Sequence, residues 1–345
     1  MRSVFPIGVS AAAACALATV TVLGQPAASR PRDILRSIAA IGDNEWAAVE
    51  RGEALAKTLE TDAREIAVVG AVRINASSDR LVDRYRTIEN LKRSAIVIDV
   101  GRFGQPPQSA DLQSAPFEPY SLDLRDCRPF DCRVRLSEQD ITRFQREVDW
   151  NAPDWPARSA SVWRTVLADH VAAYTRMGRA ALPVFVNKRD PLSVASEFAG
   201  LVSGLGFVRG YAPELLNYLH ELAPPPPEGA EGIVYWTKED FGVRPVLRVS
   251  HQTIYRAREL PAIVIATNQI YADHYLDAAL TVTLAIDAST AERRAFYLIS
   301  LSRARTRSLT GFLRSFVRTT VQNRTRDALR KILVSTRTGL EAASP

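Results

Sequence analysis

Few side chains in this sequence are suited to catalysis or metal binding. It has four histidines, and none of them has a neighbour at the spacing of H-E-x-x-H or a comparable metal motif. The nucleophile motif G-x-S-x-G and the phosphate-binding motif G-x-x-x-x-G-K are absent from the sequence as well. We therefore expect no metal and no cofactor, and the motifs leave open whether the protein is an enzyme.

Two of the histidines, His251 and His274, fall in phase with apolar residues of expected strands. Side chains two residues apart in a strand point to the same face, so each histidine would share its face with Leu, Val or Tyr side chains. Each histidine is thus a candidate polar group of a ligand pocket or a candidate acid or base, and His251, His274 and Asp273 could meet across strands. The alternative is a core histidine that hydrogen-bonds to a neighbour. The candidate lining comprises Leu247, Val249, His251, Tyr255, His274, Leu276, Leu280 and Val282.

The cysteines indicate an oxidising compartment. Cys15 lies in the N-terminal segment, which leaves Cys127 and Cys132 as a close pair. In a secreted chain, an isolated close pair is most simply a structural disulfide. Four residues separate the two cysteines, so a C-x-x-C redox motif is excluded, and no histidine is near in sequence to complete a metal site.

Residues 1–24 have the pattern of a secretory signal peptide. Arg2 is followed by an uncharged, mostly small or apolar run from Val4 to Leu23, and the small residues before Gln25 suit cleavage there. We expect a secreted or periplasmic protein after cleavage near Gly24. The alternative is an uncleaved segment that anchors the chain in a membrane, since about 20 apolar residues span a bilayer.

The composition is that of a folded protein with a sizeable core. The 345 residues are 46% hydrophobic and 24% charged, which argues against disorder as a global description. The net charge is +6 and comes mainly from arginine. This charge bears on anionic partners and carries no information about the fold.

Apolar periodicity divides the rest of the chain into segments. Residues 30–61 form an expected N-terminal helical segment, and residues 64–102 hold a strand, a helix capped at Ser77 and a second strand. Residues 103–230 are mostly helical, include the disulfide loop and end in a stiff run of four prolines. Residues 231–341 hold several strands with short connections, which favours antiparallel pairing, and then one long helix.

The order of these elements resembles the START-like, or helix-grip, superfamily. The matching pieces are Glu65–Ile74 with Ser77–Leu81, the strands from Val234 to Leu301, and Gly311–Arg314 leading into the last helix. The resemblance implies an α+β fold in which a curved antiparallel sheet packs on a long C-terminal helix and encloses a cavity. Residues 103–230 would then be a large helical insertion into a core made of the segments before and after it.

The long C-terminal helix is strongly basic. Asp327 is the only acidic residue between Arg303 and Arg337. The arginines of the helix are not interleaved with aromatic residues, which argues against nucleic acid as a partner. An anionic membrane surface is a candidate partner, to which each basic side chain contributes about 1 kcal/mol; the alternative is a solvated helix face. The candidate residues are Arg314, Arg318 and Arg330.

Three functions follow as hypotheses. The resemblance implies a secreted protein that holds a lipid or another apolar small molecule in a START-like cavity. A second hypothesis is an enzyme on the same scaffold, because some members of the superfamily are catalysts, with His251 or His274 as acid or base. A third is an envelope-associated structural or interaction module that uses the basic C-terminal helix.

Overall fold

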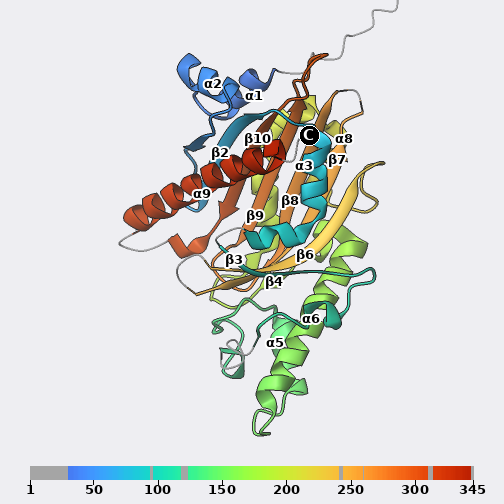
Figure 1. Ribbon diagram of the computed structural model, residues 1–345. Helices are drawn as coiled ribbons and strands as arrows, with labels where there is room; N and C mark the ends of the chain where they lie inside the picture. Colours follow the sequence, from blue (N-terminus) through green and yellow to red (C-terminus); the bar gives the residue numbers. More distant parts are fainter. Residues whose placement is uncertain are drawn as a thin grey trace, which may run out of the picture.

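The computed structural model describes residues 30–93, 96–117, 123–240, 244–258, 260–309 and 314–342 (Figure 1). The expected signal peptide lies outside these ranges. Within them, no helix is both long enough and apolar enough to cross a membrane. The fold is of the α+β class, with one large antiparallel sheet and a long helix at its C-terminal end.

One eight-stranded antiparallel sheet forms the centre of the fold. Its order is β1-β2-β10-β9-β8-β7-β6-β3, so strands from the two ends of the chain pair in its interior. A separate two-stranded ribbon, β4-β5, belongs to the insertion. The strands are β1 (Leu55–Thr58), β2 (Glu65–Ile74), β3 (Val97–Arg102), β4 (Val184–Phe185), β5 (Leu192–Ser193), β6 (Glu231–Glu239), β7 (Val246–Arg256), β8 (Ala262–Ala272), β9 (Ala278–Asp287) and β10 (Phe296–Arg305).

The helices fall before the sheet, in the insertion and at the end of the chain. Figure 1 shows α9 lying across the sheet beside β2 and β10, with α5 and α6 at the opposite end of the molecule. The α-helices are α1 (Pro31–Ile38), α2 (Asp43–Glu50), α3 (Ser78–Arg86), α5 (Glu138–Glu147), α6 (Trp155–Met177), α7 (Val194–Val202), α8 (Pro213–Glu221) and α9 (Arg314–Ala342). Short 3-10 helices are η1 (Ile88–Arg93), η2 (Ser109–Leu112), η3 (Gly178–Ala181), η4 (Gly206–Gly210) and η5 (Arg307–Leu309).

The sheet separates two hydrophobic cores. In β2, Val68 and Val72 belong to the core that includes Leu329 and Leu333 of α9, whereas Val69 belongs to the larger core on the insertion side. A strand covered on both faces has no solvent face, which explains why β2 is apolar along almost its whole length. Because successive side chains of a strand point to opposite faces, the same strands contribute residues to both cores.

Gly70 of β2 allows α9 to lie close to the sheet. A Cβ atom at this position would stand 2.6 Å from Cδ1 of Leu333 and 2.9 Å from the carbonyl oxygen of Leu55. Both distances are too short for a carbon contact. The absence of a side chain on Gly70 thus sets how tightly the C-terminal helix packs.

Two sequence expectations need correction. Residues 30–61 are not helical throughout: α2 ends near Gly52, which has a φ of 84°, and β1 then pairs with the edge of β2. Edge pairing outweighs the helical periodicity of this short segment. In addition, β9 begins at Ala278, so Leu276 and His274 lie in a turn and do not share a strand face with Leu280.

Candidate functional site

The turn from Asp273 to Asp277 connects β8 to β9 and has an unusual backbone. Tyr275 has a φ of 55°, in the left-handed region that a residue with a side chain seldom adopts. Its carbonyl oxygen accepts a hydrogen bond from Oγ1 of Thr306 at 2.7 Å, and the amide of Asp277 donates to the carbonyl of Arg305 at 2.8 Å. The end of β10 therefore holds the turn in this conformation. Backbone strain that neighbouring structure maintains is frequent at functional sites.

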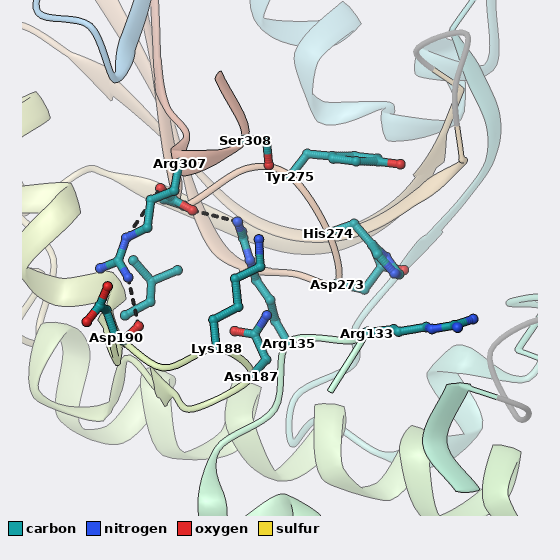
Figure 2. A pocket seen from close by; sticks show the side chains of 12 residues that line it. Arg133, Arg135, Asn187, Lys188, Asp190, Asp273, His274, Tyr275, Arg307 and Ser308 are labelled. Atoms are coloured by element: carbon teal, nitrogen blue, oxygen red, sulfur yellow. Dashed lines mark hydrogen bonds and ion pairs between the residues drawn. The ribbon is translucent and has the colours of Figure 1, made fainter. Parts of the chain in front are cut away.

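A pocket of about 170 Å³ opens beside this turn (Figure 2). Its walls come from the turn, from the segment after the cysteine loop, from the connection between β4 and β5, and from the segment after β10. Most of the lining residues are charged or polar. It comprises Arg133, Arg135, Asn187, Lys188, Asp190, Leu192, Asp273, His274, Tyr275, Asp277, Arg307 and Ser308.

Asp273 and His274 form a carboxylate–imidazole pair in the wall of the pocket. Nδ1 of His274 lies 3.0 Å from Oδ1 of Asp273, whose side chain has no exposed surface. Neither carboxylate oxygen of Asp273 accepts a hydrogen bond from the described part of the chain. A carboxylate at this distance favours the imidazole tautomer that carries its hydrogen on Nδ1.

Asp277 lies at the other end of the turn and pairs with Arg135 of the insertion. Oδ1 of Asp277 is 2.5 Å from Nη2 of Arg135, and both side chains are buried. Its second oxygen lies 3.7 Å from Arg64 and 4.0 Å from Arg307. Burial raises the pKa of the Asp277 carboxyl, and the neighbouring guanidinium groups only partly oppose this effect.

A buried lysine adds positive charge behind the turn. Lys238 of β6 is 5% exposed. Burial lowers the pKa of its ammonium group to about 8, although the attraction of Asp273 acts in the opposite direction. The carboxylate of Asp273 is thus influenced by a cation on the sheet side as well as by His274 on the pocket side.

The outer part of the pocket carries cations. Arg307 donates hydrogen bonds to the carbonyl oxygens of Asp190 and Pro191, at 2.8 and 3.0 Å, and so ties the end of β10 to the insertion. Lys188 is exposed and makes no ion pair or hydrogen bond within the described residues. In Figure 2, Lys188 and Arg135 extend into the pocket between Arg307 on one side and His274 on the other. An anion entering the pocket would meet an ammonium group that has no partner among the described residues.

The cysteine loop supports the wall that carries these cations. Cys127 and Cys132 lie at disulfide distance, with their Cα atoms 4.5 Å apart, as the sequence predicts. The amide of Phe130 donates to the carbonyl of Val186 at 2.6 Å, and the amide of Cys132 donates to the carbonyl of Asn187 at 3.2 Å. The loop is therefore hydrogen-bonded to the two residues that immediately precede Lys188.

His251 lies outside the lining of this pocket, in the larger hydrophobic core. Its Nδ1 is 2.9 Å from the hydroxyl of Tyr174 in α6, and Asn268 donates to the same hydroxyl at 3.2 Å. Burial lowers the pKa of His251 to about 4 and raises that of Tyr174. These contacts match the alternative expectation of a core histidine, and only His274 of the two faces the pocket.

The apolar residues expected to line a cavity occupy the same packed core. They are buried among residues of the insertion helices, including Val166 and Phe198. Tyr255 also reaches the edge of the insertion, where its hydroxyl donates to Glu214 of α8 at 3.2 Å. The members of this core from the candidate lining are Leu247, Val249, Tyr255, Leu280 and Val282.

The three arginines expected to face an anionic surface have different surroundings. Arg318 donates to the carbonyl oxygens of Thr61, Asp62 and Glu65, at 2.9, 3.0 and 3.3 Å. Arg330 is exposed on α9. The side chain of Arg314 lies outside the described residues.

Sequence reasoning placed His274 and Asp273 at a candidate site but missed Arg135, Lys188 and Asp277. Asp273 and Asp277 lie at the two ends of the connection between two expected strands, and Asp273 is next to a histidine. Two carboxylates and a histidine in one short connection are a pattern that points to a functional site. The two cations come from the insertion, more than 80 residues earlier in the chain, so no local pattern links them to the turn. The described residues contain no group of histidine, cysteine or acidic side chains suited to a metal ion.

The chain has no match among models of known protein families or among curated protein sequences.

Proposed function

We propose that the pocket beside residues 273–277 binds a small anionic molecule and that His274, oriented by Asp273, exchanges a proton with it. One observation carries this proposal: a fully buried carboxylate without a hydrogen bond from the described chain lies 3.0 Å from a pocket-lining imidazole. A carboxylate behind a histidine fixes which ring nitrogen holds the proton. The protein would then be an enzyme that uses His274 as a general acid or base.

The charges of the pocket support an anionic ligand. Asp277 is already paired with Arg135, and Asp273 faces His274. Asp190 is the remaining carboxylate of the lining, and it stands against three further cations, which are Arg133, Lys188 and Arg307. The pocket volume of about 170 Å³ is below the roughly 300–1,000 Å³ of sites that enclose a drug-sized ligand. A phosphate or a short carboxylic acid suits this space and this charge.

The helix-grip fold forms part of the proposal. It is supported by the order of elements, in which α3 follows β2 and a run of antiparallel strands leads to α9, and by the packing of Leu329 and Leu333 on β2. Sheet curvature and a large helical insertion with its own wall of the pocket complete the proposed architecture. A signal peptide and secretion remain predictions that suit the cysteine pair.

The hypothesis of a lipid or other apolar ligand also stays a prediction. Its expected lining is packed against the insertion helices in the described residues, so a lipid would require those helices to separate from the sheet. Such opening would expose many buried apolar side chains at a cost of about 25 cal/mol per Å². The polar pocket requires no such movement, and for this reason we favour it.

Nuclear magnetic resonance of isotope-labelled histidine tests the proposal directly. The chain has only four histidines, so the resonances of His274 are assignable with single His→Gln variants. Inorganic phosphate is the probe. We expect saturable shifts of the His274 resonances, with those of His220 unchanged, and about tenfold or greater weakening in Lys188→Gln, because a charge-assisted hydrogen bond is lost.

Arg189→Gln is the matched control for the anion site, because Arg189 is the exposed neighbour of Lys188 and does not line the pocket. The proton-exchange role has its own readout: in Asp273→Asn, the nitrogen shifts of His274 should report a changed preference between Nδ1 and Nε2, whereas Asp190→Asn should leave it unaltered. Phosphate shifts that are equal at all four histidines, or equal losses in the two cation variants, would refute the anion site.

A further inference from the structure

The outer face of α9 carries three cations that have no partner in the part of the chain that the structure describes. Arg324, Arg330 and Lys331 are exposed and make no ion pair or hydrogen bond within the described chain. The two acids of this helix are already engaged: Asp327 pairs with Arg326 at 2.9 Å and Glu341 with Arg337 at 3.0 Å. The positive charge of these three residues is therefore directed to solvent.

Exposed aliphatic side chains accompany these cations. Val321 is 36% exposed, Ile332 46% and Val334 48%, and they are three of the large apolar residues that the described chain leaves open to water. They do not pack on the sheet, because Leu329, Leu333 and Leu340 already supply the buried stripe of α9. In Figure 1, α9 lies on the outside of the sheet. At 3.6 residues per turn, Val321 and Ile332 lie at one edge of the exposed arc of the helix and Val334 at the other.

We propose that the outer face of α9, comprising Val321, Arg324, Arg330, Lys331, Ile332 and Val334, docks on an anionic lipid bilayer surface. Cations alone fit any acidic partner, but aliphatic side chains interleaved with them fit the boundary between headgroups and acyl chains. Arg318 takes no part, because it is hydrogen-bonded to the chain before β2. This inference is independent of the pocket at residues 273–277.

Vesicle binding of the full chain provides the test. The probes are phosphatidylcholine vesicles with and without phosphatidylglycerol, and the readout is the ratio of the two partition coefficients. This ratio cancels any contribution of the apolar N-terminal segment that does not depend on lipid charge. Each cation near an anionic surface contributes about a factor of five. The combined variant Arg324→Gln, Arg330→Gln and Lys331→Gln should therefore bind about a hundredfold more weakly.

The matched control removes the same charge from elsewhere on the surface. Arg209, Arg293 and Arg294 are exposed and lie outside α9, so their replacement by Gln should change binding less than threefold, which is the long-range effect of net charge alone. Equal losses in the two triple variants, or no preference for anionic vesicles, would overturn the proposal.

Replacement of the exposed aliphatic residues distinguishes binding to a bilayer from binding to a soluble acidic partner. Ile332→Ser with Val334→Ser should lower binding to phosphatidylglycerol vesicles at least tenfold, because apolar surface is withdrawn from the membrane interface. The same variant should bind soluble polyglutamate as the unaltered chain does. If binding to vesicles is also unchanged, the face recognises charge only and the bilayer assignment is wrong.

Discussion

Asp277 and Arg135 join the sheet to the insertion through a buried ion pair. The carboxylate belongs to the turn between β8 and β9, the guanidinium to the segment after the cysteine loop, and 2.5 Å separates Oδ1 from Nη2. The backbone reinforces this pair, since the amide of Arg135 donates to the carbonyl of Asp273 at 3.1 Å. The hydroxyl of Tyr271 donates to the carbonyl of Arg135, also at 3.1 Å. The pocket therefore exists only while the insertion is docked on the sheet.

Removal of one partner of this pair should destabilise the protein strongly. Arg135→Met removes the nearest cation from a buried carboxylate and leaves only Arg64 and Arg307, at 3.7 and 4.0 Å, to oppose its charge. We expect a loss of about 3 kcal/mol in the free energy of unfolding. Urea denaturation measures this loss. The double variant Arg135→Met with Asp277→Asn should lose less than the sum of the single variants, because both charges are then gone.

Arg133→Met is the control for this prediction. The side chain of Arg133 is 84% exposed, so its replacement should change stability by less than about 0.5 kcal/mol. If Arg135→Met costs no more than this control, the pair does not hold the insertion on the sheet.

The bond between Cys127 and Cys132 should act on the pocket wall more than on global stability. The bridge closes a short loop, with a sequence separation of 5, for which chain entropy predicts about 2 kcal/mol. In Cys127→Ser with Cys132→Ser, the amides of Phe130 and Cys132 should exchange hydrogen faster, because their acceptors lie across the loop on Val186 and Asn187.

Hydrogen exchange followed by mass spectrometry measures this local effect. Amides of β8 and β9 serve as the internal control, since their exchange reports global unfolding. Phosphate affinity at the pocket should fall with the faster exchange. Unchanged protection at Phe130 would mean that the hydrogen bonds to the β4–β5 segment hold the loop without the bridge.

The sequence carried enough information for much of the sheet. The richness of β2 in Val and Ile indicates a strand, and the period of two in Leu247, Val249 and Tyr255 places these residues together on one face. It did not specify what covers that face. An apolar strand face packs equally well on a ligand and on helices, and the choice depends on the insertion, whose docking involves contacts distant in sequence.

The candidate site was predictable only in part for the same reason. The sequence singles out His274 because it is two residues from Leu276, as on one face of a strand. Its position follows instead from a turn that ends the strand, with Tyr275 in the left-handed region. The expectation of one extended strand face was therefore wrong, although the residue was relevant. Lys188 had no local signal at all, because its role depends on the turn that it faces.

Arg318 and Arg330 should differ in their effects on stability, although both are arginines of α9. Arg318 donates to three carbonyl oxygens in the chain leading into β2, so Arg318→Gln leaves several acceptors without a donor. We expect a loss of about 1–3 kcal/mol, against less than about 0.5 kcal/mol for the exposed Arg330→Gln. Thermal and urea unfolding measure both, and equal effects would contradict the assignment of Arg318 to internal packing.

The stability of the protein should fall between pH 6.5 and 4 because of His251. Burial lowers the pKa of this histidine from 6.5 to about 4. Above pH 6.5, it is neutral in both states and has no effect. Below pH 6.5, the unfolded chain binds a proton that the folded chain takes up only near pH 4, so falling pH favours unfolding by about 3 kcal/mol. Urea denaturation across this range should show the loss in the unaltered protein and in the control His220→Gln. His251→Gln should remove it. If the free energy of unfolding of His251→Gln depends on pH as that of the unaltered protein does, other groups cause the pH dependence.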